Sequence, residues 1–141
     1  MSVPYCSYSD INNLMDGPNM GAATNDYDSS APLNVPMINN IILMASNQCD
    51  ALVSSIYAVP FPITNIPVKI KEACIIFTCE ALYARRLTPS DTNPFKERAE
   101  YWRKELMKVN SGELSLDAAF RRNVPPIVVS KFCSRFNDNF Y

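Results

Sequence analysis

Apolar residues recur at steps of three and four over three long stretches of the chain, with polar residues between them. In residues 36–57 the apolar positions form one face, and many of the other positions are asparagine, serine or aspartate. Residues 67–86 are apolar nearly all round, which is typical of a helix at the centre of a domain or at a subunit contact. Residues 94–111 carry a narrow apolar stripe on an otherwise charged surface. The pattern therefore predicts three long helices, the last of which packs on the outside.

A shorter helix is predicted near the N-terminus. Ser7 is its expected N-cap, and Asp10 stands three residues later, in the position of a capping box. Ile11 and Leu14 give this helix its apolar side. The next stretch, residues 16–34, is rich in glycine, proline, asparagine, aspartate and serine and shows little periodicity. We expect it to form a mobile loop.

Prolines and capping residues indicate where the long helices begin and end. Pro36 lies near the first turn of one helix, and the stretch 60–67, which holds three prolines, is expected as a stiff connector that stops it. Asn93 is expected to cap the last helix, with Pro94 at its first position. Gly112 is the residue expected to end that helix.

Residues 118–141 form a tail rich in β-branched and aromatic side chains, and Pro125 and Pro126 prevent it from extending a helix. Two interpretations stay open: the tail folds back over its own helices, or it docks on another chain. For docking, two adjacent guanidinium groups can bind carboxylates or phosphate, and the strand-competent segment after them can add to a sheet edge of a partner. The candidate docking residues are Arg121, Arg122, Val124, Ile127, Val128, Val129, Phe132 and Phe136. The chain is thus predicted to be all-α, a small bundle of about four helices over residues 1–117 with an extended C-terminal tail.

Composition argues against an enzyme. The chain has no histidine, which removes the commonest general base and metal ligand, and its three glycines form no phosphate-binding loop. Neither a signal peptide nor an apolar run of bilayer length is evident. Five cysteines lack disulfide-like or zinc-like spacing, so they are expected as small buried residues in a reducing compartment. We expect no catalytic residue, no cofactor, no metal site and no membrane insertion. The cysteines are Cys6, Cys49, Cys74, Cys79 and Cys133.

Charge is distributed unevenly along the chain. Before Lys69 there are five aspartates and no basic residue, whereas from Lys69 onward thirteen basic residues accompany nine acidic ones. Such polarity suits head-to-tail stacking of copies or docking onto a charged partner. An acidic N-terminal loop explains it equally well.

Two other groups of residues suggest chemistry more weakly. Glu72 and Glu80 lie eight residues apart and resemble paired carboxylates, but solvation or pairing with Lys69 or Arg86 is the favoured interpretation. Met37 and Met44 could form part of a binding surface, but they are expected to fill the core.

An alternative function is that of a cytoplasmic regulator that binds nucleic acid. Trp102 with basic neighbours suggests base stacking and phosphate contacts. Trp102 falls on the apolar stripe, however, and nearby acidic residues dilute the charge, so a solvated helix face is favoured. The basic residues that this alternative requires are Arg98, Arg103, Lys104, Arg121 and Arg122.

An ordered set of motifs resembles the small helical head–tail connector proteins of tailed bacteriophages, in particular those of Mu-like prophages. The set covers about residues 4–16 and 35–117, and the chain departs from it in the longer loop at 17–34 and in the tail. Each motif is weak alone and becomes specific in this order. The motifs are YCSYSDINNL, SSIYAVPFP, PVKIKEACIIFTCEALYARR and FKERAEYWRKELMKVNSGELSL.

The resemblance implies that the chain is an adaptor or head-completion protein without catalytic residues. Such proteins assemble as a homo-oligomeric ring, usually of twelve copies, beneath the portal protein. Genomic DNA passes through the lumen without sequence-specific binding, and a neck or tail-completion protein docks below. The implied location is the head–tail neck of the virion, after assembly in the bacterial cytoplasm. We expect the helical domain to build the ring and the tail to anchor it to a neighbour, with the portal as the first candidate.

Overall fold

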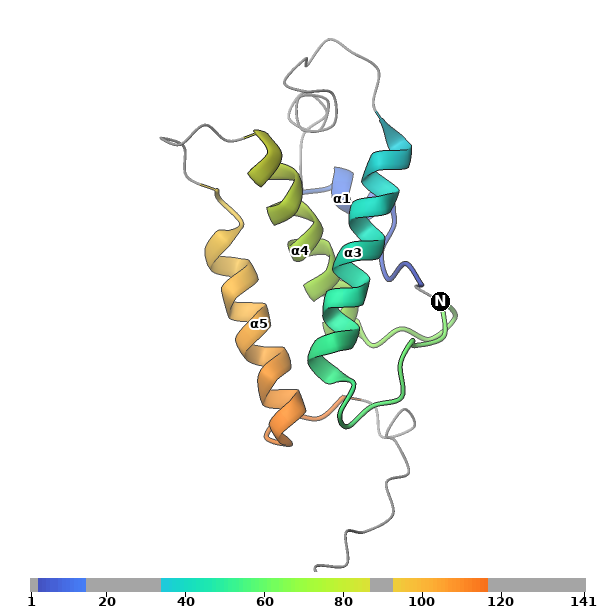
Figure 1. Cartoon of the computed structure of the whole chain (residues 1–141), viewed down its shortest axis with the longest axis vertical. Coiled ribbons are helices and arrows are strands. Elements are labelled where there is room, and N and C mark those ends of the chain that lie inside the picture. Colours follow the sequence, from blue (N-terminus) through green and yellow to red (C-terminus); the bar gives the residue numbers. More distant parts are fainter. Residues whose placement is uncertain (1–2, 15–33, 87–92, 117–141) are drawn as a thin grey trace, which may run out of the picture.

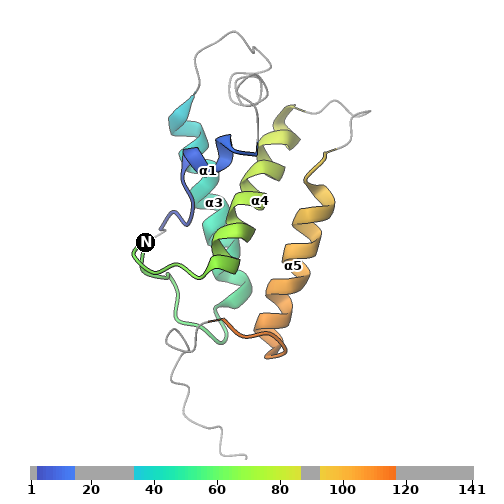
Figure 2. The same ribbon diagram turned by 180° about the vertical axis from the view of Figure 1, so that it is seen from behind.

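Four helices pack together in the computed structural model, which describes residues 3–14, 34–86 and 93–116. They are α1 (Tyr8–Asn12), α3 (Val35–Val53), α4 (Val68–Arg86) and α5 (Lys96–Ser111). The three long helices alternate in direction, with α4 between α3 and α5, and the short α1 crosses beside α3 and α4 (Figures 1 and 2). The all-α prediction is confirmed, and the described residues form no strand.

The start of α1 is as predicted. The backbone N–H of Ser7 donates to the Asp10 carboxylate at 2.8 Å, and the Ser7 hydroxyl donates to the same oxygen at 3.0 Å. Partial burial disfavours the charged form of Asp10, but these hydrogen bonds and the nearby Lys71 ammonium outweigh it and lower the Asp10 pKa. The helix is shorter than the pattern suggested, since Leu14 lies beyond its end and is exposed.

The helix predicted over 36–57 ends earlier than expected. Its N-cap is Asn34, whose side chain accepts a hydrogen bond from the Met37 N–H at 3.2 Å, and the helix stops at Val53. The chain then turns so that Tyr57 and Phe61 enter the core, where both are fully buried. The Tyr57 hydroxyl accepts a hydrogen bond of 2.7 Å from the backbone N–H of Leu116. The stretch expected as a stiff connector therefore contributes to the core.

The last helix begins two residues later than predicted, at Lys96. Asn93 does not cap it; its side chain accepts from the Phe95 N–H at 3.0 Å and donates to the Glu80 carbonyl at 3.0 Å. This turn ties the start of α5 to α4. The predicted end is confirmed, because Gly112 follows Ser111 with a φ of 86°, a left-handed conformation that glycine adopts without strain.

Helix α4 lies centrally in the bundle, as its nearly all-round apolar character predicted, but it shares this position with α3. Each of these two helices packs against the other three. The inner face of α4 differs in detail from the predicted one: Ala81 and Ala84 are exposed, while Thr78 and Cys79 are fully buried. The apolar spacing predicts a face made of Ile70, Ala73, Cys74, Phe77, Ala81 and Ala84. The prediction of buried cysteines is confirmed for the four described ones, and Cys133 lies outside the described residues. Their thiols contact core groups; for example, Cys6 Sγ lies 3.5 Å from Cys74 Sγ.

The N-terminal segment is anchored in the core by a tyrosine. The Tyr5 hydroxyl donates to the Asp50 carboxylate at 2.5 Å and accepts from the backbone N–H of Phe61 at 2.9 Å. The backbone N–H of Tyr5 donates to Ser46 Oγ at 3.1 Å. One side chain thus joins the N-terminal segment, α3 and the connector that precedes α4.

Three predictions fall on parts of the chain that the structure does not describe. They are the mobile loop at 16–34, of which only Asn34 is described, the extended tail 118–141 and all eight candidate docking residues.

Candidate protein-protein interface

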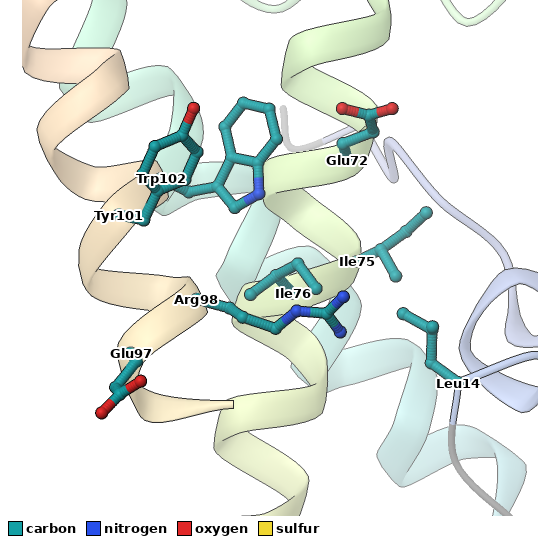
Figure 3. A pocket seen from close by; sticks show the side chains of 8 residues that line it. All are labelled: Leu14, Glu72, Ile75, Ile76, Glu97, Arg98, Tyr101 and Trp102. Atoms are coloured by element: carbon teal, nitrogen blue, oxygen red, sulfur yellow. The ribbon is translucent and has the colours of Figure 1, made fainter. Parts of the chain in front are cut away.

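An apolar groove lies between α4 and α5, with the end of the N-terminal segment along one side. Its cavity volume is about 580 Å³. Trp102 and Arg98 reach from α5 toward α4, with Ile76 between them and Leu14 on the far side (Figure 3). Trp102 is partly buried, while Leu14 and Tyr101 are 43% and 56% exposed. We call this the α4–α5 groove; it is lined by Leu14, Glu72, Ile75, Ile76, Glu97, Arg98, Tyr101 and Trp102.

A second apolar groove lies between α3 and α4. Its cavity volume is about 340 Å³. Met44 lines it with a side chain that is 70% exposed, so the prediction that this methionine fills the core was wrong. Arg85, also exposed, lines its α4 side. This α3–α4 groove is lined by Ile41, Met44, Ala45, Gln48, Phe77, Ala81 and Arg85.

The two grooves use opposite faces of α4. Glu72 lines one and Ala81 lines the other, nine residues later. At 3.6 residues per turn, nine residues make about two and a half turns, so the two positions point in opposite directions. Because α4 is apolar on both faces, it has more apolar surface than α1, α3 and α5 cover. The sequence signal for this was the nearly all-round apolar pattern of residues 67–86, although the grooves themselves were not predicted.

The outer surface of α3 carries no charge. Each exposed residue of this helix is uncharged, and its single acidic residue, Asp50, is partly buried and bound to Tyr5. By contrast, exposed positions of α5 carry several charges of both signs. Residues spaced four, four, three and four apart place five exposed α3 side chains in one row along the helix. We call this row the uncharged stripe; it consists of Pro36, Asn40, Met44, Asn47 and Ala51.

The carboxylates suspected of forming a pair do not. Glu80 is bound by Arg103, whose Nη2 lies 3.2 Å from Oε1 and 3.1 Å from Oε2 of Glu80. Glu72 instead lines the α4–α5 groove. The Arg103 guanidinium also lies over the Phe77 ring, 5.1 Å from its centroid. Arg103 therefore holds α5 against α4.

This arrangement leads to a prediction that bears on the nucleic-acid alternative. Replacing Arg103 with alanine should lower the free energy of unfolding by about 1–2 kcal/mol, because the partly buried Glu80 carboxylate loses its cation and Phe77 loses its cover. Urea unfolding followed by circular dichroism measures this change. Lys104→Ala, which removes a neighbouring exposed charge, should cost less than about 0.5 kcal/mol. Equal losses for both variants would contradict the structural role of Arg103.

The acidic residues and cysteines of the described ranges bear on metal binding and thiol chemistry. Within these ranges no three cysteine, aspartate or glutamate side chains are placed to hold a metal ion. A hydrogen bond with Cys74 and burial raise the pKa of Cys6, and burial raises the pKa of Cys79 to about 12, so these two thiols are not ready nucleophiles at neutral pH. Hydrogen bonds with Cys49 and Cys6 instead lower the pKa of Cys74, whose side chain is fully buried. In the part of the chain that is described, no helix has the length and apolar character needed to cross a membrane.

Comparison with known proteins identifies one matching family. A family model described as Bacteriophage Mu, Gp36 matches residues 5–128. The match includes the loop at 17–34 and extends into the tail, beyond residue 117 where the motif resemblance ended. No curated protein matches the chain significantly.

Proposed function

We propose that this chain, which belongs to the Bacteriophage Mu, Gp36 family, is a structural head–tail connector of a tailed phage. In this role several copies form a ring beneath the portal, DNA passes through the ring, and a neck or tail-completion protein docks on its other side. The protein then resides in the head–tail neck of the virion. No enzymatic step forms part of the proposal.

One observation carries this proposal beyond family membership: the small domain exposes two different apolar grooves, on opposite faces of α4. Contacts between unlike surfaces join copies head to tail, and such contacts close into rings when the rotation between copies permits. A monomeric regulator has no evident need for apolar grooves that the described residues leave unfilled on both faces of α4. The nucleic-acid alternative is less favoured, because one of its basic residues, Arg103, is engaged by Glu80.

The tail has a separate part in the proposal. We assign residues 118–141 to anchoring the ring on a neighbouring protein, with the portal as the first candidate. The tail begins just after Leu116, which is held against the core by its hydrogen bond to Tyr57. The helical domain therefore ends in a fixed position from which an anchoring segment can extend.

Removal of the gene from a phage that carries it tests the function. We expect DNA-filled heads and separate tails to accumulate, visible by electron microscopy of lysates, because connector proteins are needed only at the joining step. Supplying the full chain from a plasmid should restore joined particles, and supplying a chain that ends at Asp117 should not. Joined particles in normal number without the chain would refute the connector role. Joined particles with the shortened chain would refute the anchoring role of the tail alone.

A further inference from the structure

We propose that the uncharged stripe of one copy packs into the α4–α5 groove of the next copy, with Met44 as the side chain that enters the groove. The inference rests on the proposed connector function and names the contact that would build its ring. The occupant of the groove is thus a second copy of this chain.

The shapes of the two surfaces suit each other. Met44 is a long, flexible apolar side chain that is 70% exposed near the middle of α3. The α4–α5 groove is walled by the aliphatic side chains of Ile75 and Ile76 and by the Trp102 ring. Its volume of about 580 Å³ exceeds one methionine side chain, so it can also accept a neighbouring residue of the stripe.

The charges of the two surfaces are also compatible. Glu72, Glu97 and Arg98 line the α4–α5 groove, and an approaching charged helix would place like charges against some of them. The uncharged stripe avoids that cost, and its amides can donate to carboxylates or accept from a guanidinium. Arg85 lines the α3–α4 groove together with Met44, so it approaches the neighbouring copy with Met44. The α4–α5 groove of that neighbour has two acidic residues and one basic residue in its lining, so the positive charge of Arg85 is attracted to it.

The geometry favours a head-to-tail contact over a symmetric pair. The stripe and the α4–α5 groove are different surfaces, so a copy that offers its stripe to one neighbour still has its groove free for another. This property allows a closed ring, whereas a contact of stripe with stripe would stop at two copies.

Two charge-introducing variants test the contact: Met44→Glu in the stripe and Tyr101→Glu in the groove. Both positions are more than half exposed, so neither change should unfold the domain. The measurement is the mass of purified full-length protein in solution, by light scattering over a range of concentrations. The wild type should form oligomers larger than dimers. Each variant alone should be monomeric, with association weakened at least ~100-fold because a buried contact receives an unpaired charge.

Mixing the two variants gives the sharpest result. The Tyr101→Glu copy keeps an intact stripe and the Met44→Glu copy keeps an intact groove, so the mixture should form one-to-one dimers and nothing larger. Met107→Glu is the matched control, because Met107 is 60% exposed on α5 and lines neither groove. This control should assemble like the wild type, and all variants should share its thermal unfolding midpoint within a few degrees.

Other outcomes would overturn the inference. If Tyr101→Glu prevents assembly and Met44→Glu does not, the groove receives something else, such as the tail of a neighbouring copy. If both variants assemble normally, the ring uses other surfaces. A wild type that stays monomeric at all concentrations would also reject this contact. None of these results touches the connector function, which the gene-removal experiment tests separately.

Discussion

Replacing Tyr5 with phenylalanine is expected to lower the free energy of unfolding by about 2–4 kcal/mol, although only one oxygen atom is lost. The Tyr5 hydroxyl donates to Asp50 and accepts from the backbone N–H of Phe61, and Tyr5 and Phe61 are buried. Removal of the hydroxyl leaves a half-buried carboxylate and a buried N–H without these partners, and each orphaned group costs about 1–3 kcal/mol. Chemical unfolding followed by circular dichroism measures the loss.

Tyr8→Phe is the matched control for this change. Tyr8 lies nearby on α1, is partly buried, and its hydroxyl makes no hydrogen bond within the described residues. Its replacement should change the free energy of unfolding by less than about 0.5 kcal/mol. If Tyr5→Phe were equally mild, water or a rearranged neighbour would be replacing the hydroxyl, and the anchoring role of Tyr5 would be wrong.

The same hydroxyl predicts how stability changes at alkaline pH. Burial, together with donation to Asp50, raises the pKa of Tyr5 well above its ordinary value of 10.0. The folded state therefore keeps this proton at pH values where the unfolded chain has lost it. The stabilisation is complete below pH 10.0 and is lost as pH rises from there toward the folded pKa. The free energy of unfolding of the wild type should fall in this range more steeply than that of Tyr5→Phe.

The helices were predictable because each one carries its own local signal. Apolar positions repeat at helical spacing in α3, α4 and α5. The Asp10 side chain suits the start of α1, and the backbone freedom of Gly112 suits the end of α5. The central place of α4 also followed from its sequence, since a helix that is apolar nearly all round must be covered on several sides. These signals do not depend on which other segment provides the cover.

The grooves and the long-range contacts were not predictable in the same way. Met44 has the chemistry of a core residue, but its spacing places it in the exposed row of the uncharged stripe. Glu80 could have paired with any cation within reach, and the packing of α5 selects Arg103. The pairing of Glu80 depends on the angle between α4 and α5, which apolar periodicity does not encode. The anchoring role assigned to the tail stays a prediction.

The burial of a residue in the connector between α3 and α4 was not predicted, for a related reason. Its prolines correctly indicate that no helix continues, but they say nothing about burial. Phe61 lies among these prolines and is fully buried, with its ring centroid 5.8 Å from that of Tyr5. A short irregular segment has no periodicity that would mark one of its residues as part of the core.

Replacing Phe61 with alanine should therefore lower the free energy of unfolding by about 3–5 kcal/mol, the largest loss that we expect from a single change in this chain. The ring is fully buried, and its removal leaves a cavity beside Tyr5 that the surrounding helices cannot close fully. Urea unfolding of full-length protein measures the loss. Ile63→Ala is the matched control, because Ile63 lies in the same connector and is 67% exposed, and it should cost less than about 0.5 kcal/mol.

The double variant of Tyr5→Phe and Phe61→Ala shows whether the two residues act as one unit. Phe61→Ala removes the ring but keeps the backbone N–H that donates to the Tyr5 hydroxyl. If the ring holds the connector so that this hydrogen bond can form, the effects of the two changes should not be additive. The free energy of unfolding of the double variant should then fall by at least about 0.5 kcal/mol less than the sum of the two single decreases, because residues in contact are commonly coupled. Additive losses would mean that the ring and the hydrogen bond stabilise the connector independently. A small effect of Phe61→Ala alone would mean that the connector lies outside the cooperative core.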